Sequence, residues 1–127
     1  DFRQCGDATI PREHFAAQRY CPDGRVCQIS PGGEGVANAD FLLYVTAHDD
    51  SVCSSGGVRA YANACAHDQQ DRPIAGFLNF CMSQVLGSKS WSEDVATAMH
   101  EMLHALGFSS TAFAFFRDDT GAPRTPR

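Results

Sequence analysis

The sequence lacks the features that would place it across a membrane or on a nucleic acid. It has no run of about 18 apolar residues, so no helix of this chain is expected to span a bilayer. The stretch DFRQCGDATIP at the N-terminus has neither the basic nor the apolar region of a signal peptide, and in an exported protein such a signal is expected upstream or already removed. The ten Lys and Arg residues are scattered and the net charge is −5, which predicts no nucleic-acid partner.

The sequence also lacks a CxxC pair, although it contains six cysteines. An even number of cysteines in a short chain predicts three disulfides, with 15 pairings open, and favours an exported protein. A zinc site made of thiolates is the alternative, but the wide and irregular spacings disfavour it. Cys21 and Cys27 flank the turn sequence PDGRV and are suitably placed to close a small loop.

No internal repeat is present, and 127 residues with 43% apolar side chains suit one small domain or a piece of a larger one. Residues 1–39 are rich in Gly, Pro and charge and are predicted to be mostly loop. Residues 40–81 are predicted to hold the strands, and residues 91–107 a helix. The pattern indicates two or three strands followed by one strong helix, which is an α+β arrangement.

Three segments are predicted strands. Asp40 to Asp49 (DFLLYVTAHD) is a continuous apolar run, which favours a buried central strand. Val58 to Asp68 (VRAYANACAHD) alternates loosely and suits an edge strand, with an Ala-rich helix as the alternative. Asp71 to Cys81 (DRPIAGFLNFC) begins with a proline that a strand start tolerates and a helix interior does not.

The helix over 91–107 is the clearest element. Ser90 and Glu93 match a capping box, with Ser92 as the alternative cap, and Gly107 offers a left-handed end. On a helical wheel His100 and His104 point roughly 140° away from an apolar stripe that is predicted to be the core face. The members of that stripe are Val95, Met99, Met102 and Leu106.

The stretch HEMLH offers the chemistry of a metal-dependent hydrolase. His100 and His104 are one helical turn apart, so their imidazoles can bind one Zn²⁺ at about 2.0–2.1 Å each. Glu101 is displaced by about 100° and can instead reach a water bound to the metal, whose pKa zinc lowers to roughly 7. A carboxylate in that place can act as general base when the water attacks a peptide carbonyl, and later pass the proton to the leaving nitrogen. A solvated helix face with two accidental histidines is the alternative.

The sequence contains no obvious third ligand. In the compact pattern HExxHxxGxxH the third histidine would be at position 110, which is Ser110 here. Asp118 and Asp119 are weak substitutes downstream. The remaining histidines are His14, His48 and His67. His48 and His67 lie near predicted strand ends and are predicted to be exposed or hydrogen-bonded rather than ligands.

Several segments together resemble the leishmanolysin-like metallopeptidases, the surface-protease family within the metzincins. HEMLHALGFS resembles the zinc helix of that family and CGDATIP its upstream Cys-Gly-Asp segment. The likeness extends to GVANADFLLYV, to CAHDQQDRPIAGFLNFC and to FAFFRDDTGAPRTPR. The stretch RYCPDGRVCQISPGG departs from the family pattern and is interpreted as an insertion.

The resemblance implies a fragment of the N-terminal subdomain of a metzincin catalytic domain, in which a twisted mixed sheet packs on the active-site helix and disulfides staple the fold. In the family the third histidine follows a large insertion after the glycine, so residues 108–127 are expected to be the start of that insertion. The first strand and helix of the N-terminal subdomain are expected to precede Asp1. The family likeness also pairs Cys5 with Cys65 and Cys53 with Cys81, which leaves Cys21 with Cys27.

By the same resemblance the protein is expected to be an extracellular or cell-surface zinc endopeptidase acting on proteins or peptides. Membrane anchoring or assembly would depend on parts outside this chain. An extended peptide is expected to pair with the edge strand around Val58 to Ala66, which gives broad specificity. The fragment alone is expected to be inactive for want of the third ligand. Two alternatives stay open: a non-catalytic structural or adhesive module that retains the fold, and a small secreted disulfide-stapled domain.

Overall fold

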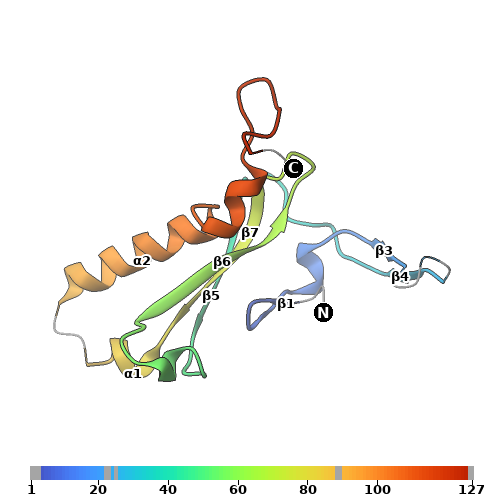
Figure 1. Cartoon of the computed structure of the whole chain (residues 1–127). Helices are drawn as coiled ribbons and strands as arrows, with labels where there is room; N and C mark the ends of the chain where they lie inside the picture. Colours follow the sequence, from blue (N-terminus) through green and yellow to red (C-terminus); the bar gives the residue numbers. More distant parts are fainter. Residues whose placement is uncertain (1–3, 22–23, 25, 88–89, 126–127) are drawn as a thin grey trace.

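A three-stranded mixed sheet with one long helix on its face forms the body of the molecule (Figure 1). The computed structural model describes residues 4–21, 24, 26–87 and 90–125. The strands of the sheet are β5 (Leu42–Ala47), β6 (Ala60–His67) and β7 (Pro73–Phe80), and the helix is α2 (Trp91–Ala105). Strand β7 lies in the middle, parallel to β5 and antiparallel to β6. The α+β class, the mixed sheet and the helix packed on it are as predicted.

The order of the strands in the sheet differs from the predicted order at β5 and agrees with it at β6. The prediction that residues 40–49 form the central strand is wrong, because β5 is at one edge and Val45 is 58% exposed. A continuous apolar run does not distinguish the strands of a parallel pair, and β7 takes the centre because it pairs with both neighbours. The edge position of β6 is confirmed, and the helical alternative for that segment is wrong.

The helix lies close to the sheet because small residues meet at the interface. A Cβ atom on Gly76 of β7 would lie 3.0 Å from Cβ of Ala105 and 2.9 Å from the backbone oxygen of Asn63. Ala105 and Leu78 are almost fully buried. The prediction that Val95, Met99, Met102 and Leu106 form the core face of the helix is therefore wrong: all four are exposed, Met99 by 62%.

The physical reason for this error is the size of the residues at the real interface. The positions of α2 that are not exposed are polar or small. Because a close helix–sheet approach selects small side chains, the most apolar stripe of a helix need not be its buried one. The residues of this inner face are Asp94, Thr97, Ala98, Glu101, His104 and Ala105.

Both ends of α2 are capped as predicted. The hydroxyl of Ser90 accepts a hydrogen bond from the backbone N–H of Glu93 at 3.4 Å. At the other end Gly107 has φ 103°, its N–H bonds to the carbonyl of His104, and the N–H of Phe108 bonds to the carbonyl of Leu103. This pair of bonds is a Schellman motif, which turns the chain sharply after the helix.

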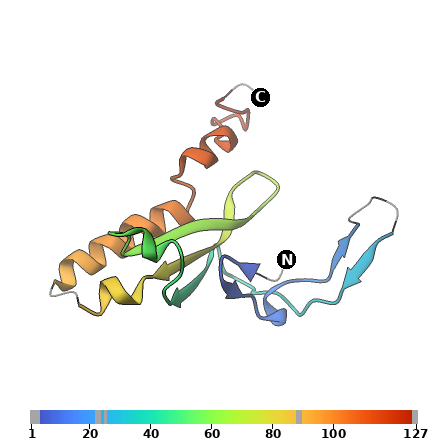
Figure 2. The same ribbon diagram turned by 60° about the horizontal axis from the view of Figure 1, so that its bottom comes forward.

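The segment before the sheet contains more structure than the predicted loop. Two short hairpins pair antiparallel strands, and the second projects away from the sheet (Figure 2). The turn PDGRV lies largely outside the described residues. The elements are β1 (Gln4–Cys5), β2 (Ala8–Thr9), η1 (Arg12–His14), β3 (Gln18–Tyr20) and β4 (Gln28–Ser30).

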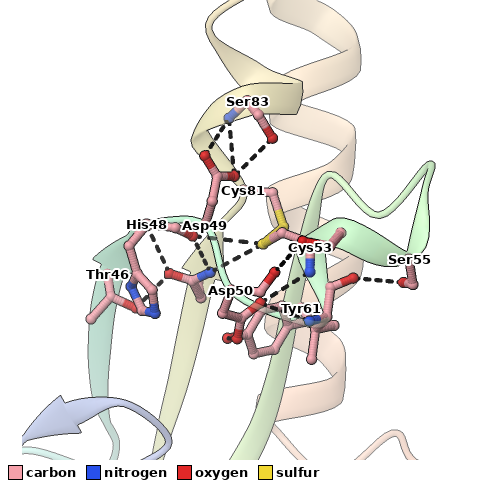
Figure 3. The surroundings of a disulfide bond; sticks show 12 residues. Thr46, His48, Asp49, Asp50, Cys53, Ser55, Tyr61, Cys81 and Ser83 are labelled. Carbon is pink, nitrogen blue, oxygen red and sulfur yellow. Dashed lines mark hydrogen bonds between the residues drawn. A yellow bond between two sulfur atoms is a disulfide. The ribbon is translucent and has the colours of Figure 1, made fainter.

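The three disulfides expected from the family likeness are confirmed: Cys5–Cys65, Cys21–Cys27 and Cys53–Cys81. The first ties β1 to β6, and the third ties η2 (Cys53–Ser55) to the end of β7 (Figure 3). Next to the third lies the fully buried amide of Asn79, which accepts from Thr46 Oγ1 at 2.9 Å and from the N–H of His48 at 3.2 Å.

Two further short elements complete the chain: α1 (Met82–Val85) leads from the sheet toward α2, and η3 (Ser110–Phe115) follows α2. Ser83 at the start of α1 donates backbone and hydroxyl hydrogen bonds to Asp49, which fixes α1 against the loop after β5 (Figure 3). Within the described residues, no helix combines the length and the apolar character needed to cross a membrane.

Candidate metal centre

The two histidines of the HExxH stretch meet at the surface of α2. The Nε2 atoms of His100 and His104 are 3.1 Å apart, and the rings are nearly perpendicular with centroids 4.8 Å apart. His100 is exposed and His104 is half-buried. Two metal–nitrogen bonds of about 2.0–2.1 Å can close such a spacing, so the pair is geometrically able to share one ion.

The ring of His104 is held from behind by the chain that follows the helix. Its Nδ1 lies 2.7 Å from the carbonyl oxygen of Phe108. Because a carbonyl can only accept, Nδ1 carries the proton in this hydrogen bond, and in the neutral imidazole the lone pair is on Nε2. Metal-ligating histidines usually donate their second ring nitrogen to a carbonyl or carboxylate in this way. The Schellman turn at Gly107 places the Phe108 carbonyl there.

Glu101 lies between the helix and strand β6. Burial raises the pKa of its carboxyl, while the charges of His104 and His100 and a hydrogen bond from the backbone of Ala62 act in the opposite direction. The net direction is upward, toward the range in which a carboxylate can accept a proton and release it again. The side chain lines the same pocket as His100. This position beside the histidine pair is the one that the sequence pattern predicted.

Two pockets lie between β6 and α2, one beside His100 and one beside His104, and together we call them the groove. The first is an open pocket of about 500 Å³ that includes Ala60 and His100. The second is a smaller pocket of about 120 Å³ between Ala64, His104 and the segment after the helix. The alternate residues of β6 along this groove are alanines, which leave room beside the strand: Ala60, Ala62 and Ala64.

No third ligand accompanies the pair among the residues that the structure describes. Asp118, one of the two weak substitutes named from the sequence, instead accepts hydrogen bonds within its own turn from Thr120 and Ala122. His67 lines the smaller pocket together with His104, but the described chain contains no set of three ligand atoms around the pair. A complete site therefore needs a donor from elsewhere.

The described residues do contain one group of three potential ligands, which lies where β5 ends and β6 begins. Ligand atoms of Asp7, His48 and Asp50 lie within 4.8 Å of one another. Tyr61 donates its hydroxyl to Asp50 at 2.7 Å and lies 3.2 Å from Asp7, while His48 Nε2 is 3.2 Å from Asp7. These hydrogen bonds hold the cluster together without an ion.

The sequence pattern gave no sign of this cluster, because its members lie on two separate segments, one at Asp7 and one after β5, that the Cys5–Cys65 disulfide and the sheet bring together. Asp50 also accepts from the backbone N–H groups of Val52 and Cys53. The bond from Cys53 and the bond from Tyr61 hold the pKa of Asp50 below its usual value, and burial followed by the bond to Asp50 raises the pKa of Tyr61. The prediction of a hydrogen-bonded role for His48 agrees with this arrangement.

A helix that presents two histidines four residues apart with a glutamate after the first, beside the edge strand of a mixed sheet, is the arrangement of a metallopeptidase. The known proteins that this chain is similar to are of the same class. A leishmanolysin family model (peptidase M8) matches residues 4–120. The chain belongs to the leishmanolysin family of metallopeptidases.

Individual relatives support this assignment. The leishmanolysin-like peptidases of Drosophila melanogaster and Caenorhabditis elegans are 43% and 44% identical to this chain over 129 and 126 residues, each covering 97% of it. The ciliated left-right organizer metallopeptidase of Mus musculus is 44% identical over 118 residues, or 90% of the chain. The chain spans 19%, 19% and 17% of the length of these relatives.

A metallopeptidase family implies a metal cofactor, and the residues present fit one. The paired Nε2 atoms, the proton on Nδ1 of His104 and the neighbouring carboxylate of Glu101 are the donor set and the base that a zinc site with an open position uses. The assignment of His100 and His104 as ligands and of Glu101 as base stays a prediction.

Proposed function

We propose that this chain is the part of a zinc-dependent endopeptidase that carries two of the metal ligands and the general base. The observation that carries the proposal is the 3.1 Å approach of the two Nε2 atoms, with His104 oriented by the Phe108 carbonyl. His100 and His104 would hold the ion, with a third ligand from outside the described residues. When bound, zinc would lower the pKa of a bound water and polarise the substrate carbonyl.

The protein residues then have distinct tasks. Glu101 accepts the proton of the attacking water and passes it to the leaving amine, and its raised pKa suits a group that must take up and release a proton in one cycle. The hydrogen bond from Ala62 fixes the carboxylate at the edge of β6. The Phe108 carbonyl keeps the His104 ring in the orientation that frees Nε2 for the metal.

The proposed substrate is an extended stretch of polypeptide. Among the described residues no strand pairs with the outer edge of β6, so an extended peptide can add to that edge, where the N–H groups of Ala62 and Ala64 now donate to Glu101 and to Asn63 Oδ1. The alanines along the groove leave space for a backbone beside the helix. Recognition through the main chain supports broad sequence specificity.

We further propose that the protein works outside the cell or at its surface. Support comes from the three disulfides, which form and persist in oxidising compartments. Proteins or peptides in that compartment would be the substrates.

The decisive variant is Glu101→Gln in the complete protein, because it preserves the shape of the side chain and removes the base. The proposal predicts that kcat for a quenched fluorescent peptide falls by about 10²–10⁴-fold while the zinc content per chain is unchanged. Both quantities can be measured on one preparation, by fluorescence and by elemental analysis.

Glu93→Gln is the matched control, since Glu93 is on the same helix but lies at its first turn beside Arg59. It should leave both kcat and zinc content unchanged. Equal activities of wild type and Glu101→Gln would remove Glu101 from the mechanism. A complete protein with neither zinc nor activity would instead favour a non-catalytic module that retains the fold.

A further inference from the structure

The groove beside His104 has a wall made by the segment that follows the helix. The smaller pocket is bounded on one side by Ala64 and His67 of β6 and on the other by Ser109, Thr111 and Phe115. The ring of Phe115 faces that of His67, with centroids 6.3 Å apart. The segment 109–115 therefore stands across the end of the groove at the C-terminal end of β6, where η3 lies over the end of α2 (Figure 1).

Packing alone leaves this wall loosely attached. A second cavity, of about 190 Å³, lies between the same segment and the turn that joins β6 to β7, lined by Pro73, Leu106, Ala112 and other residues. Pockets on two sides of one short segment leave part of its interface unfilled, so fewer dispersion contacts hold the segment than in a close-packed interface. A polar attachment then matters more than it would in a close-packed interface.

Arg117 supplies such an attachment. Its Nε donates to the carbonyl of Gln70 at 3.1 Å, and its guanidinium forms an ion pair with Asp71 through a second nitrogen. Its third nitrogen donates to the carbonyl of Gly121 at 3.0 Å. The ion pair is partly shielded, since the two side chains are 33% and 25% exposed. One planar side chain thus bridges the β6–β7 turn and the loop after η3.

Both partners of Arg117 are rigid in themselves. In the β6–β7 turn, Asp68 accepts from the N–H groups of Gln70 and Arg72 at 2.8 and 2.9 Å. In the loop after η3, Asp118 accepts from the N–H groups of Thr120 and Ala122, both at 2.9 Å. The planar guanidinium of Arg117 joins these two loops with a defined geometry. It therefore sets the distance between the loops and the position of segment 109–115.

We propose that Arg117 is a positioning residue that holds segment 109–115 as the end wall of the peptide groove, and that this wall contacts an extended substrate. The inference rests on the proposed peptidase function. A peptide that pairs antiparallel with β6 has its N-terminal end at the C-terminal end of β6. The residues before its scissile bond therefore lie beside the wall. Long substrates therefore touch the wall, whereas peptides that lack those residues end before it.

The test compares two peptides on the complete protein and on Arg117→Ala. One peptide carries four residues before the scissile bond and the other carries one, with the same sequence after it. Arg117→Ala should raise KM for the long peptide about tenfold, leave KM for the short one unchanged, and leave kcat and zinc content unchanged, because it removes binding that is equal in the ground and transition states. Arg117→Lys keeps the charge beside Asp71 but not the fork, and should restore part of the loss.

Arg124→Ala is the matched control. Arg124 is in the same loop, but its described hydrogen bonds run to the carbonyls of Phe116 and Arg117 rather than to the β6–β7 turn. It should leave KM for both peptides unchanged.

Equal changes for the long and the short peptide, or no change for either, would overturn the role of the wall while the peptidase activity of the wild type stands. A KM increase that appears only with extra residues after the scissile bond would overturn the antiparallel placement. A wild-type protein without peptidase activity would overturn the proposed function, and this inference with it.

Discussion

At the scale of single residues, the structure separates two groups of ligand-type side chains with different surroundings. The Nε2 atoms of His100 and His104 are 3.1 Å apart, and the charges of both rings act on the half-buried Glu101. The cluster of Asp7, His48 and Asp50 is instead internally bonded through Tyr61. The first group has two neighbouring ring nitrogens that a cation can bridge, and the second stabilises the end of the sheet as it stands.

The role of Asp50 predicts how stability depends on pH. Its folded pKa is depressed, chiefly by the backbone N–H of Cys53 and then by Tyr61, so its contribution is present above the unfolded pKa of about 3.9 and is lost as pH falls through the folded pKa. Asp50→Asn should therefore lower the stability at pH 7, and the difference from wild type should shrink below about pH 4. Urea unfolding at a series of pH values measures both.

Asp40→Asn serves as the control for this prediction, because the Asp40 side chain is 93% exposed and 3.7 Å from an arginine. It should leave the stability at pH 7 almost unchanged. A difference between wild type and Asp50→Asn that stays constant from pH 7 to pH 3 would contradict the account of Asp50.

At the scale of elements, α2 shows what sequence patterns can and cannot predict. Its limits follow from local chemistry, since Ser90 and Gly107 act on their immediate neighbours, and the i, i+4 histidine spacing defines one face of any helix. Which face packs on the sheet depends on Gly76 and on the alanines of β6, far away in the chain. The core-face prediction therefore failed, and His104 lies half-buried on the inner face. The assignment of the two histidines as metal ligands stays a prediction.

The other features also divide into those set by neighbouring residues and those set by contacts far apart in the chain. The strand segments were recognisable from apolar and β-branched runs, but the central place of β7 depends on pairing partners. The orienting carbonyl of Phe108 and the N–H of Ala62 are backbone groups, so no residue type in the sequence marks them. Arg117 was one of ten scattered basic residues until the fold placed it against Asp71.

The helix end gives a prediction for both stability and metal binding. Gly107→Ala forces an alanine into φ 103° and brings its Cβ to 3.3 Å from Pro73, so it should cost about 1–2 kcal/mol. It should also weaken zinc binding by about tenfold, because the shifted turn displaces the Phe108 carbonyl from His104. Thermal unfolding and competition with a zinc chelator measure the two effects.

Gly56→Ala separates the two effects. Gly56 has φ 80° with open space around it and is not adjacent to the histidine pair in the chain. It should cost a similar amount of stability and leave zinc affinity unchanged. Equal losses of zinc affinity in the two variants would remove the Schellman turn from the metal site.

At the scale of the whole molecule, the outer face of α2 is apolar and uncovered. Met99, Met102 and Leu103 are 62%, 42% and 49% exposed, and Val95 and Leu106 extend the same surface. Contiguous apolar surface on a small protein promotes association. The groove and the apolar outer face lie on different sides of α2, so the two can be altered independently.

This surface predicts that the 127-residue chain associates as its concentration rises. Met99→Gln combined with Leu106→Gln should reduce the association without lowering the unfolding temperature, since neither side chain is buried. Sedimentation velocity at several concentrations measures the change. Identical sedimentation of wild type and variant over that range would contradict the prediction.

The central claim is that α2 binds a divalent cation through His100 and His104. A crystal structure of the complete protein with zinc, phased at the zinc absorption edge, tests this most directly. The account predicts an ion about 2.0–2.1 Å from Nε2 of both His100 and His104, with the Phe108 carbonyl still bonded to His104 Nδ1. An ion bound between Asp7, His48 and Asp50 while the histidine pair holds none would contradict it.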